Sequence, residues 1–151
     1  MEISILFLPL IASIISGFFG KYIGDRNSEI VTSALVSISA FLSIFVLYQV
    51  IVNQYEENIV IATWINSGSL DVNWSMLIDP LSAVMLVVVT SVSSLVHIYS
   101  IGYMSDDPHK PRFMAYLSLF TFAMLMLVTS DNFIQLFFGW EGVGLCSYFL
   151  I

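Results

Sequence analysis

The sequence predicts an all-α integral membrane protein with five transmembrane helices and a small β-hairpin on the outer face between the second and third. Of its 151 residues, 58% are hydrophobic and only 10% are charged, and the mean hydropathy is +0.93. A soluble domain of this size cannot bury so much apolar surface. Five apolar runs also have the length of roughly twenty residues that a helix needs to cross a bilayer.

The first two apolar runs predict helices over residues 3–22 and 30–53. Glu2 stands where a secretory signal peptide would carry basic residues, and the first run is longer than the apolar core of such a signal. We therefore expect the first helix to remain in the mature protein and to span the membrane.

The polar stretch after residue 53 predicts a β-hairpin. Two β-prone runs, VIATWI and VNWSMLI, flank the turn-rich residues 66–69. The third helix is expected over residues 80–104. Asp79 and Pro80 suit its start, because a carboxylate is favourable near the N-terminal end of a helix and proline fits the first helical position.

The last two apolar runs predict helices over residues 113–129 and 133–151. We find no internal repeat, and we therefore treat residues 1–151 as one membrane unit. The single cysteine, Cys146, lies within the last run. It leaves no disulfide framework and no metal-ligand spacing, so we expect no metal site.

The basic residues predict how the chain crosses the membrane. Lys21 and Arg26 lie in the first loop, and Lys110 and Arg112 lie in the third, whereas the second loop is acidic. Inner-face loops retain lysine and arginine, so we expect the N-terminus on the outer side of a bacterial or mitochondrial inner membrane. The net charge of -7 argues against nucleic acid as a partner.

Glu141 is the main candidate functional residue. It is the only charged residue of the apolar run FFGWEGVGLCSYFLI. At 1.5 Å per residue from Phe133 it lies roughly 12 Å into a hydrocarbon layer about 30 Å thick. Burial favours the neutral acid and a nearby cation favours the carboxylate, so a mobile cation can switch it, as a proton relay requires. The alternative is a structural acid that hydrogen-bonds to a neighbouring helix.

Two weaker candidates lie on the third helix. His97 is the other ionisable group within a predicted span, and imidazole can pass a proton from one ring nitrogen to the other. Its alternative role is a packing residue with satisfied hydrogen bonds. Asp79 is a candidate at the start of the helix, although helix capping alone would explain it.

Two long stretches resemble a known family. IDPLSAVMLVVVTSVSSLVHIYSIGYM and DPHKPRFMAYLSLFTFAMLMLVTSDNFIQLFFGWEGVGLCSYFLI are similar to the proton-antiporter-like family. Within it they resemble the membrane subunits of respiratory NADH:quinone oxidoreductase (complex I), of the type called subunit L in bacteria and subunit 5 in mitochondria. The resemblance begins at the N-terminal FLPLIASIISGFFGKYIG and covers the whole chain.

The resemblance implies a part of the proton-translocating membrane arm, coupled at a distance to NADH oxidation and quinone reduction. No cofactor is expected on this chain, since NADH, flavin, iron-sulfur clusters and quinone belong elsewhere in the complex. Glu141 matches the family's fifth-helix glutamate, which is thought to pair with a lysine on a later helix. Asp79 and His97 match recurrent third-helix positions of less settled role. The implied partners are other membrane-arm subunits, the bilayer and protons.

The chain also departs from the family, whose members have more than a dozen helices. The segment that carries the partner lysine lies outside these 151 residues, which suggests a truncated sequence or one piece of a split subunit. None of the four lysine and arginine residues lies deep in a predicted span. Two alternative functions stay open: a subunit of a multisubunit sodium/proton antiporter, and a non-conducting packing or assembly subunit.

Overall fold

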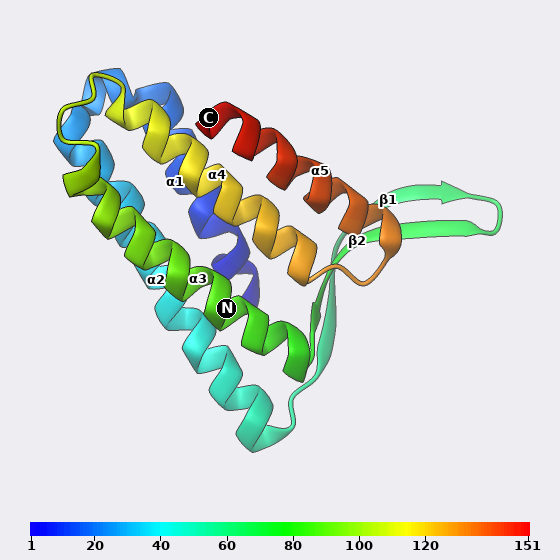
Figure 1. Cartoon of the computed structure of the whole chain (residues 1–151). Coiled ribbons are helices and arrows are strands. Elements are labelled where there is room, and N and C mark those ends of the chain that lie inside the picture. Colours follow the sequence, from blue (N-terminus) through cyan, green and yellow to red (C-terminus); the bar gives the residue numbers. More distant parts are fainter.

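Five helices and one two-stranded sheet make up the fold, as the computed structural model of all 151 residues shows (Figure 1). In chain order the elements are α1 (Glu2–Ile23), α2 (Asp25–Asn53), β1 (Glu57–Ser67), β2 (Leu70–Ile78), α3 (Pro80–Tyr103), α4 (Lys110–Val128) and α5 (Phe133–Leu150). All five helices are long and apolar enough to cross a membrane. The predicted fold class is confirmed, including the hairpin between the second and third helices.

Two helices begin earlier than the apolar runs indicate. α2 already starts at Asp25 and α4 at Lys110. The first turn of a helix has free backbone N–H groups that suit water and acidic side chains, and it tolerates a proline such as Pro111. Polar first turns therefore extend these helices beyond the apolar segments by which we identified them.

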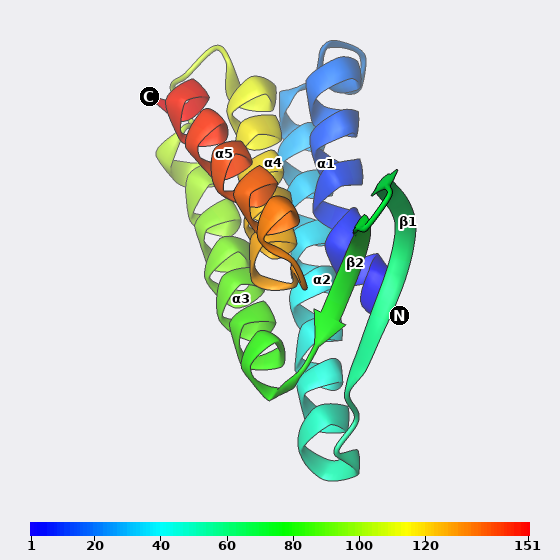
Figure 2. The same cartoon turned by 90° about the vertical axis from the view of Figure 1, so that its right-hand side faces the viewer.

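The helices form a bundle with two distinct ends (Figures 1 and 2). One end holds the start of α1, the end of α2, the β-hairpin and the start of α3. The other end holds the α1–α2 turn, the α3–α4 loop and the last turn of α5. Within the bundle α4 packs against α1 and α5, while α2 packs against α1 and α3. α5 therefore lies at the edge, and α4 is its main neighbour.

Hydroxyl groups join the helices inside the bundle. Ser37 bonds to Ser94 and Ser43 to Thr90, each at 2.8 Å, so two links connect α2 with α3. Ser39 donates to a backbone carbonyl of α1 at 2.8 Å. In lipid there is little hydrophobic force between helices, and such hydrogen bonds and close contacts replace it.

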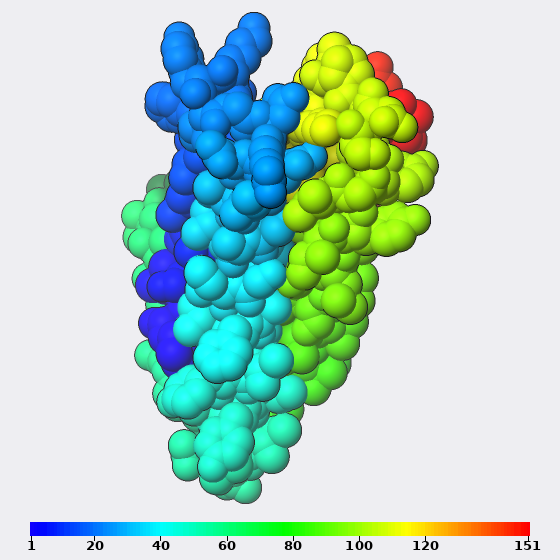
Figure 3. Space-filling model, turned by 90° about the vertical axis from the view of Figure 1, so that its left-hand side faces the viewer, coloured from blue at the N-terminus to red at the C-terminus, as the bar shows by residue number.

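The outer surface of the helices is apolar. Figure 3 shows the face along which α2 and α3 run side by side, with α2 reaching further than the other helices at the hairpin end. Phe41 on α2 and Leu95 on α3 are both exposed. Such a surface suits contact with lipid tails or with other transmembrane segments.

The hairpin packs against α5. β1 and β2 pair antiparallel from Glu57 with Ile78 to Ser67 with Leu70, and Gly68 in the connecting turn has a φ of +64°, which favours glycine. Trp64, Trp74 and Phe138 of α5 form one aromatic cluster, in which the ring centroid of Trp74 lies 4.8 Å from each of the other two and Trp64 lies 6.0 Å from Phe138. Aromatic packing thus joins the sheet to the start of the last helix.

Gln135 fastens the hairpin to α5. Its side chain is completely buried. The backbone N–H of Ser75 donates to its Oε1 at 3.0 Å, and its Nε2 donates to the carbonyl oxygen of Ser75 at 2.7 Å. One residue upstream of α5, Asn132 accepts from the N–H of Gln135 at 2.8 Å and donates to the carbonyl of Asn73 at 2.9 Å. The side-chain amides of Asn132 and Gln135 thus bond to backbone groups of β2, as a neighbouring third strand would do.

Asp131 adds a second attachment in the α4–α5 turn. It accepts hydrogen bonds from Asn58 at 2.9 Å and from Asn132 at 2.7 Å. Partial burial alone would raise the pKa of Asp131, but the nearby Ser75 hydroxyl and the two asparagine donors outweigh it, and the pKa lies below its ordinary value. The Ser75 hydroxyl acts by proximity, since it makes no hydrogen bond of normal geometry.

Replacing Gln135 with leucine is expected to loosen the hairpin. The N–H and C=O of Ser75 would be buried without partners, and we expect a loss of about 1–3 kcal/mol in the free energy of unfolding. Limited proteolysis at the Gly68 turn and the melting temperature of the assembled protein measure this. Gln49→Leu on α2 is the matched control, because Gln49 is half-buried and takes part in none of the hydrogen bonds above. Equal cleavage at the Gly68 turn in the two variants would contradict the attachment of the hairpin to α5 through Gln135.

Candidate functional site

Glu141 lies on the outward side of α5. Its side chain is exposed, and its neighbours along the same side, Phe137, Leu145 and Tyr148, are exposed as well. The one ion pair of the chain joins the N-terminal amine to Glu2, so Glu141 has no ionic partner among these residues. A carboxylate on an apolar surface near the middle of the bilayer is costly unless another group pairs with it.

Two glycines set the orientation of Glu141. A Cβ atom at Gly139 would lie 2.8 Å from backbone atoms of Leu127, and one at Gly142 would lie 3.2 Å from the Cβ of Ala123. Both glycines therefore lie in close contact with α4. Two residues along a helix correspond to about 200° around its axis, so contact through Gly139 turns Glu141 away from α4.

The basic residues lie far from the middle of the helices. Lys21 is in the last turn of α1, Arg26 is in the first turn of α2, and Lys110 and Arg112 open α4. All four thus occupy the end of the bundle opposite the hairpin. Pairing of Glu141 with a cation from another segment or another subunit therefore stays a prediction.

His97 is buried between α3 and α4. Its exposed fraction is 0%. Nδ1 lies 2.7 Å from the carbonyl oxygen of Ser93, and Nε2 lies 3.0 Å from the hydroxyl of Ser118 on α4. A carbonyl can only accept, which places the proton of the neutral ring on Nδ1 and leaves Nε2 to accept from Ser118. The Ser93 hydroxyl also bonds to Thr121 of α4.

These contacts explain the buried position of His97 as a structural link between α3 and α4. Both ring nitrogens have partners, and the ring together with Ser93 joins α3 to α4 much as the hydroxyl pairs join α3 to α2. This arrangement matches the packing alternative. A role for His97 in proton relay stays a prediction.

Asp79 caps α3. Its carboxylate accepts from the backbone N–H of Ser82 at 2.6 Å, and the Ser82 hydroxyl accepts from the N–H of Asp79 at 2.8 Å, which completes a reciprocal capping box. Pro80 occupies the first helical position, as expected from the sequence. Capping accounts for the contacts of Asp79, and any further role remains a prediction.

The three predicted residues do not form one cluster. Asp79 lies at the hairpin end, His97 at the α3–α4 interface and Glu141 on the outer side of α5, and none is hydrogen-bonded to another. Sequence reasoning missed Gln135, which carries no charge. Its signal was the Asn132-x-x-Gln135 spacing of a capping box directly before an apolar run.

Comparison with known proteins agrees with the resemblance seen in the sequence. Residues 64–114 match the family model described as the N-terminus of NADH-ubiquinone oxidoreductase (complex I) chain 5. The whole chain is 56% identical to NADH-ubiquinone oxidoreductase chain 5 of Arabidopsis thaliana and covers 23% of that protein. It is 53% identical over 149 residues (99% of this chain) to chain 5 of Phytophthora infestans, covering 22% of it. With chain 5 of Metridium senile it shares 50% identity over all 151 residues, covering 25%.

The chain thus spans about a quarter of the length of the curated relatives that it matches. The predicted resemblance is confirmed. The family-model match includes Asp79 and His97 and ends before Glu141, whereas the full-length similarity extends over Glu141 as well. Multi-pass membrane insertion follows from the five apolar helices together with this relationship.

Proposed function

We propose, on the premise that this chain is related over its full length to the N-terminal part of complex I chain 5, that it belongs to the proton-translocating membrane arm of NADH:ubiquinone oxidoreductase. The observation that carries the proposal is 56% identity along all 151 residues to a protein of that name. The same similarity favours complex I over a sodium/proton antiporter or a pure packing subunit.

In the proposed mechanism Glu141 alternates between the neutral and the ionised form. A lysine from a segment outside this chain approaches the outward side of α5 and stabilises the carboxylate form, so that the neutral acid of Glu141 releases its proton. When the cation withdraws, the low-dielectric surroundings favour the neutral acid again, and Glu141 takes up a proton. The glycine contacts with α4 hold α5 in place, so that the cation moves rather than the acid.

The redox steps are assigned to other subunits. The chain has one cysteine, and it has no group of three or more histidine, cysteine, aspartate or glutamate side chains arranged to hold a metal ion. On the relationship to complex I chain 5, NADH, flavin, iron-sulfur clusters and quinone are proposed to bind elsewhere in the complex. The contribution of this chain is proton transfer within the membrane and contact with neighbouring membrane-arm subunits.

The proposed location is the inner membrane, with the N-terminus on the outer side. All four basic residues lie at the end of the bundle formed by the α1–α2 turn and the α3–α4 loop. By the positive-inside rule this end faces the cytoplasm or the mitochondrial matrix. The hairpin then lies on the outer face.

A native gel of detergent-solubilised source membranes tests the assignment. We expect an antibody against the hairpin to label a band that also stains for NADH dehydrogenase activity. A second blot probed with antibody that has been preincubated with the hairpin peptide controls for antibody specificity. Migration of the chain away from every NADH-active band would instead support the antiporter or the packing role.

A further inference from the structure

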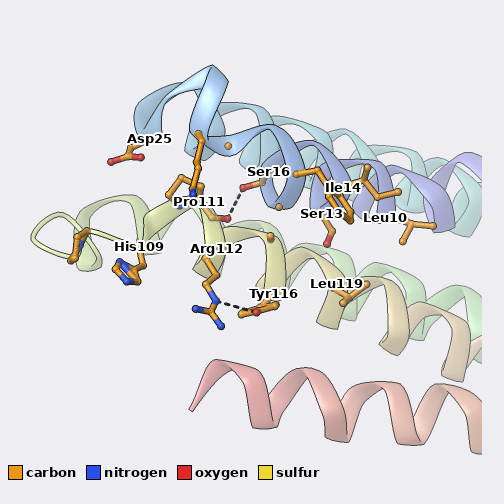
Figure 4. A pocket seen from close by; sticks show the side chains of 16 residues that line it. Leu10, Ser13, Ile14, Ser16, Asp25, His109, Pro111, Arg112, Tyr116 and Leu119 are labelled. Atoms are coloured by element: carbon orange, nitrogen blue, oxygen red, sulfur yellow. Dashed lines mark hydrogen bonds between the residues drawn. The ribbon is translucent and has the colours of Figure 1, made fainter.

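A cavity of about 820 Å³ opens at the end of the bundle that carries the basic residues. It lies between α1, α4 and the loop that joins α3 to α4 (Figure 4). Lys21, His109 and Arg112 line its polar part, and Asp25 is the only carboxylate in the lining. Lys21, Arg112 and Asp25 thus give the lining two positive charges and one negative charge.

Both permanent cations are free to bind an anion. The chain's one ion pair joins the N-terminal amine and Glu2, so neither Lys21 nor Arg112 is neutralised by a carboxylate. Arg112 uses only its Nε, which donates to the hydroxyl of Tyr116 at 3.1 Å. The terminal nitrogens of the guanidinium group thus keep the paired donors that match a phosphate.

Aromatic contacts hold Arg112 in position. Its guanidinium carbon lies 5.5 Å from the ring centroid of Tyr116, and Tyr116 stacks on Phe149 of α5 at 5.3 Å. Figure 4 shows Arg112 and Tyr116 along the same side of α4. A preoriented arginine loses less conformational entropy when it binds a ligand than a freely rotating one.

The other part of the cavity is apolar and leads toward the middle of the membrane. Leu10 and Ile14 of α1 and Leu119 of α4 line it, and Figure 4 shows them at the opposite end from His109. Leu10 precedes Lys21 by a distance of roughly 16 Å along the helix axis, and Leu119 follows Arg112 by roughly 10 Å. The lining therefore changes from charged to apolar along the membrane normal.

Direct contact between α1 and α4 closes one wall of the cavity. Ser16 donates to the carbonyl oxygen of Pro111 at 2.6 Å and bonds to Ser28 of α2 at 2.6 Å. A Cβ atom at Gly20 would lie 2.6 Å from the Cβ of Pro111. The helices cannot approach more closely here, so the cavity has a fixed wall.

We propose that this cavity binds one anionic phospholipid, with its phosphodiester on Lys21 and Arg112 and the first part of an acyl chain along Leu10, Ile14 and Leu119. A small anion alone leaves the apolar half unused, and an uncharged apolar ligand leaves the two cations without a partner. Basic pockets between transmembrane helices favour anionic head groups, and arginine binds phosphate through two parallel hydrogen bonds.

The test measures lipid binding to the intact complex that contains this chain. The complex is purified, partly delipidated and titrated with phosphatidylglycerol, and bound lipid is counted by native mass spectrometry. The double variant Lys21→Gln, Arg112→Gln is compared with Arg26→Gln, Lys110→Gln. The control pair removes the same charge from the same end of the bundle, but neither residue lines the cavity.

For the most tightly bound phosphatidylglycerol molecule, we expect the dissociation constant of the cavity variant to be at least about tenfold higher than that of the wild type. The control variant should bind this lipid as the wild type does. Three results would overturn the proposal. These are equal loss in both variants, equal binding of phosphatidylcholine with the same acyl chains, and displacement of the lipid by inorganic phosphate at millimolar concentration, which would show a plain anion site.

Discussion

Replacing Glu141 with glutamine is expected to abolish proton transport through this part of the membrane arm while the complex still assembles. Glutamine keeps the size of the side chain and its ability to hydrogen-bond, but it cannot release a proton. A side chain that transfers a proton typically increases the rate of the step by about 10²- to 10⁴-fold. We therefore expect proton pumping per NADH oxidised to fall by at least about tenfold where this step limits the coupled cycle.

The measurement combines proton uptake into inverted membrane vesicles with the amount of assembled complex on a native gel. Glu57→Gln is the matched control, since Glu57 is an exposed acid at the start of β1 and lies outside the helices. Glu141→Asp keeps the acid one methylene further back and should retain part of the activity. A variant that fails to assemble, with no defect specific to pumping, would assign Glu141 to packing.

Replacing Gly139 with alanine is expected to displace α5. The added Cβ would lie 2.8 Å from both the backbone nitrogen and the Cα of Leu127, and 2.9 Å from its Cβ. Backbone atoms cannot rotate out of the way, so the two helices must separate. Inserting a methyl group into a closely packed interface typically costs about 1–3 kcal/mol.

The structure offers a matched control on the same helix. Gly144 has no atom within 4 Å of the Cβ that an alanine would add, so Gly144→Ala should assemble as the wild type does. We expect Gly139→Ala to lower both the yield of assembled complex and its melting temperature. Because α5 carries Glu141, pumping should fall with assembly, in contrast to the Glu141→Gln variant. Equal behaviour of the two alanine variants would contradict the close α4–α5 contact.

The fold could be predicted because each element has a local signal. Apolar runs of membrane-spanning length mark the five helices, and Gly68 between β-prone runs marks the hairpin. Asp79 and Pro80 have the capping geometry that their residue types favour. These signals depend on neighbours along the chain and not on tertiary contacts.

The site could be predicted only in part, because its properties depend on contacts between distant residues. Glu141 stands out as a charge in an apolar run, but the direction it faces depends on the contact of Gly139 with α4. The attachment of Gln135 to Ser75 spans sixty residues of sequence. Lys21 and Arg112 give a clear signal for orientation, yet only the folded bundle places them around one cavity.

The length of α2 has a consequence for the bilayer around this chain. Its 29 residues span roughly 43 Å, well beyond a hydrocarbon core about 30 Å thick. Its first turn, residues 25–29, is polar, so the apolar part of α2 spans roughly 36 Å, a length that helix tilt can fit to the hydrocarbon core. The apolar side chains of Ile51 and Val52 are exposed at the far end. We therefore expect α2 to cross the bilayer at a tilt of roughly 30° from the membrane normal, and a thicker membrane should reduce this tilt.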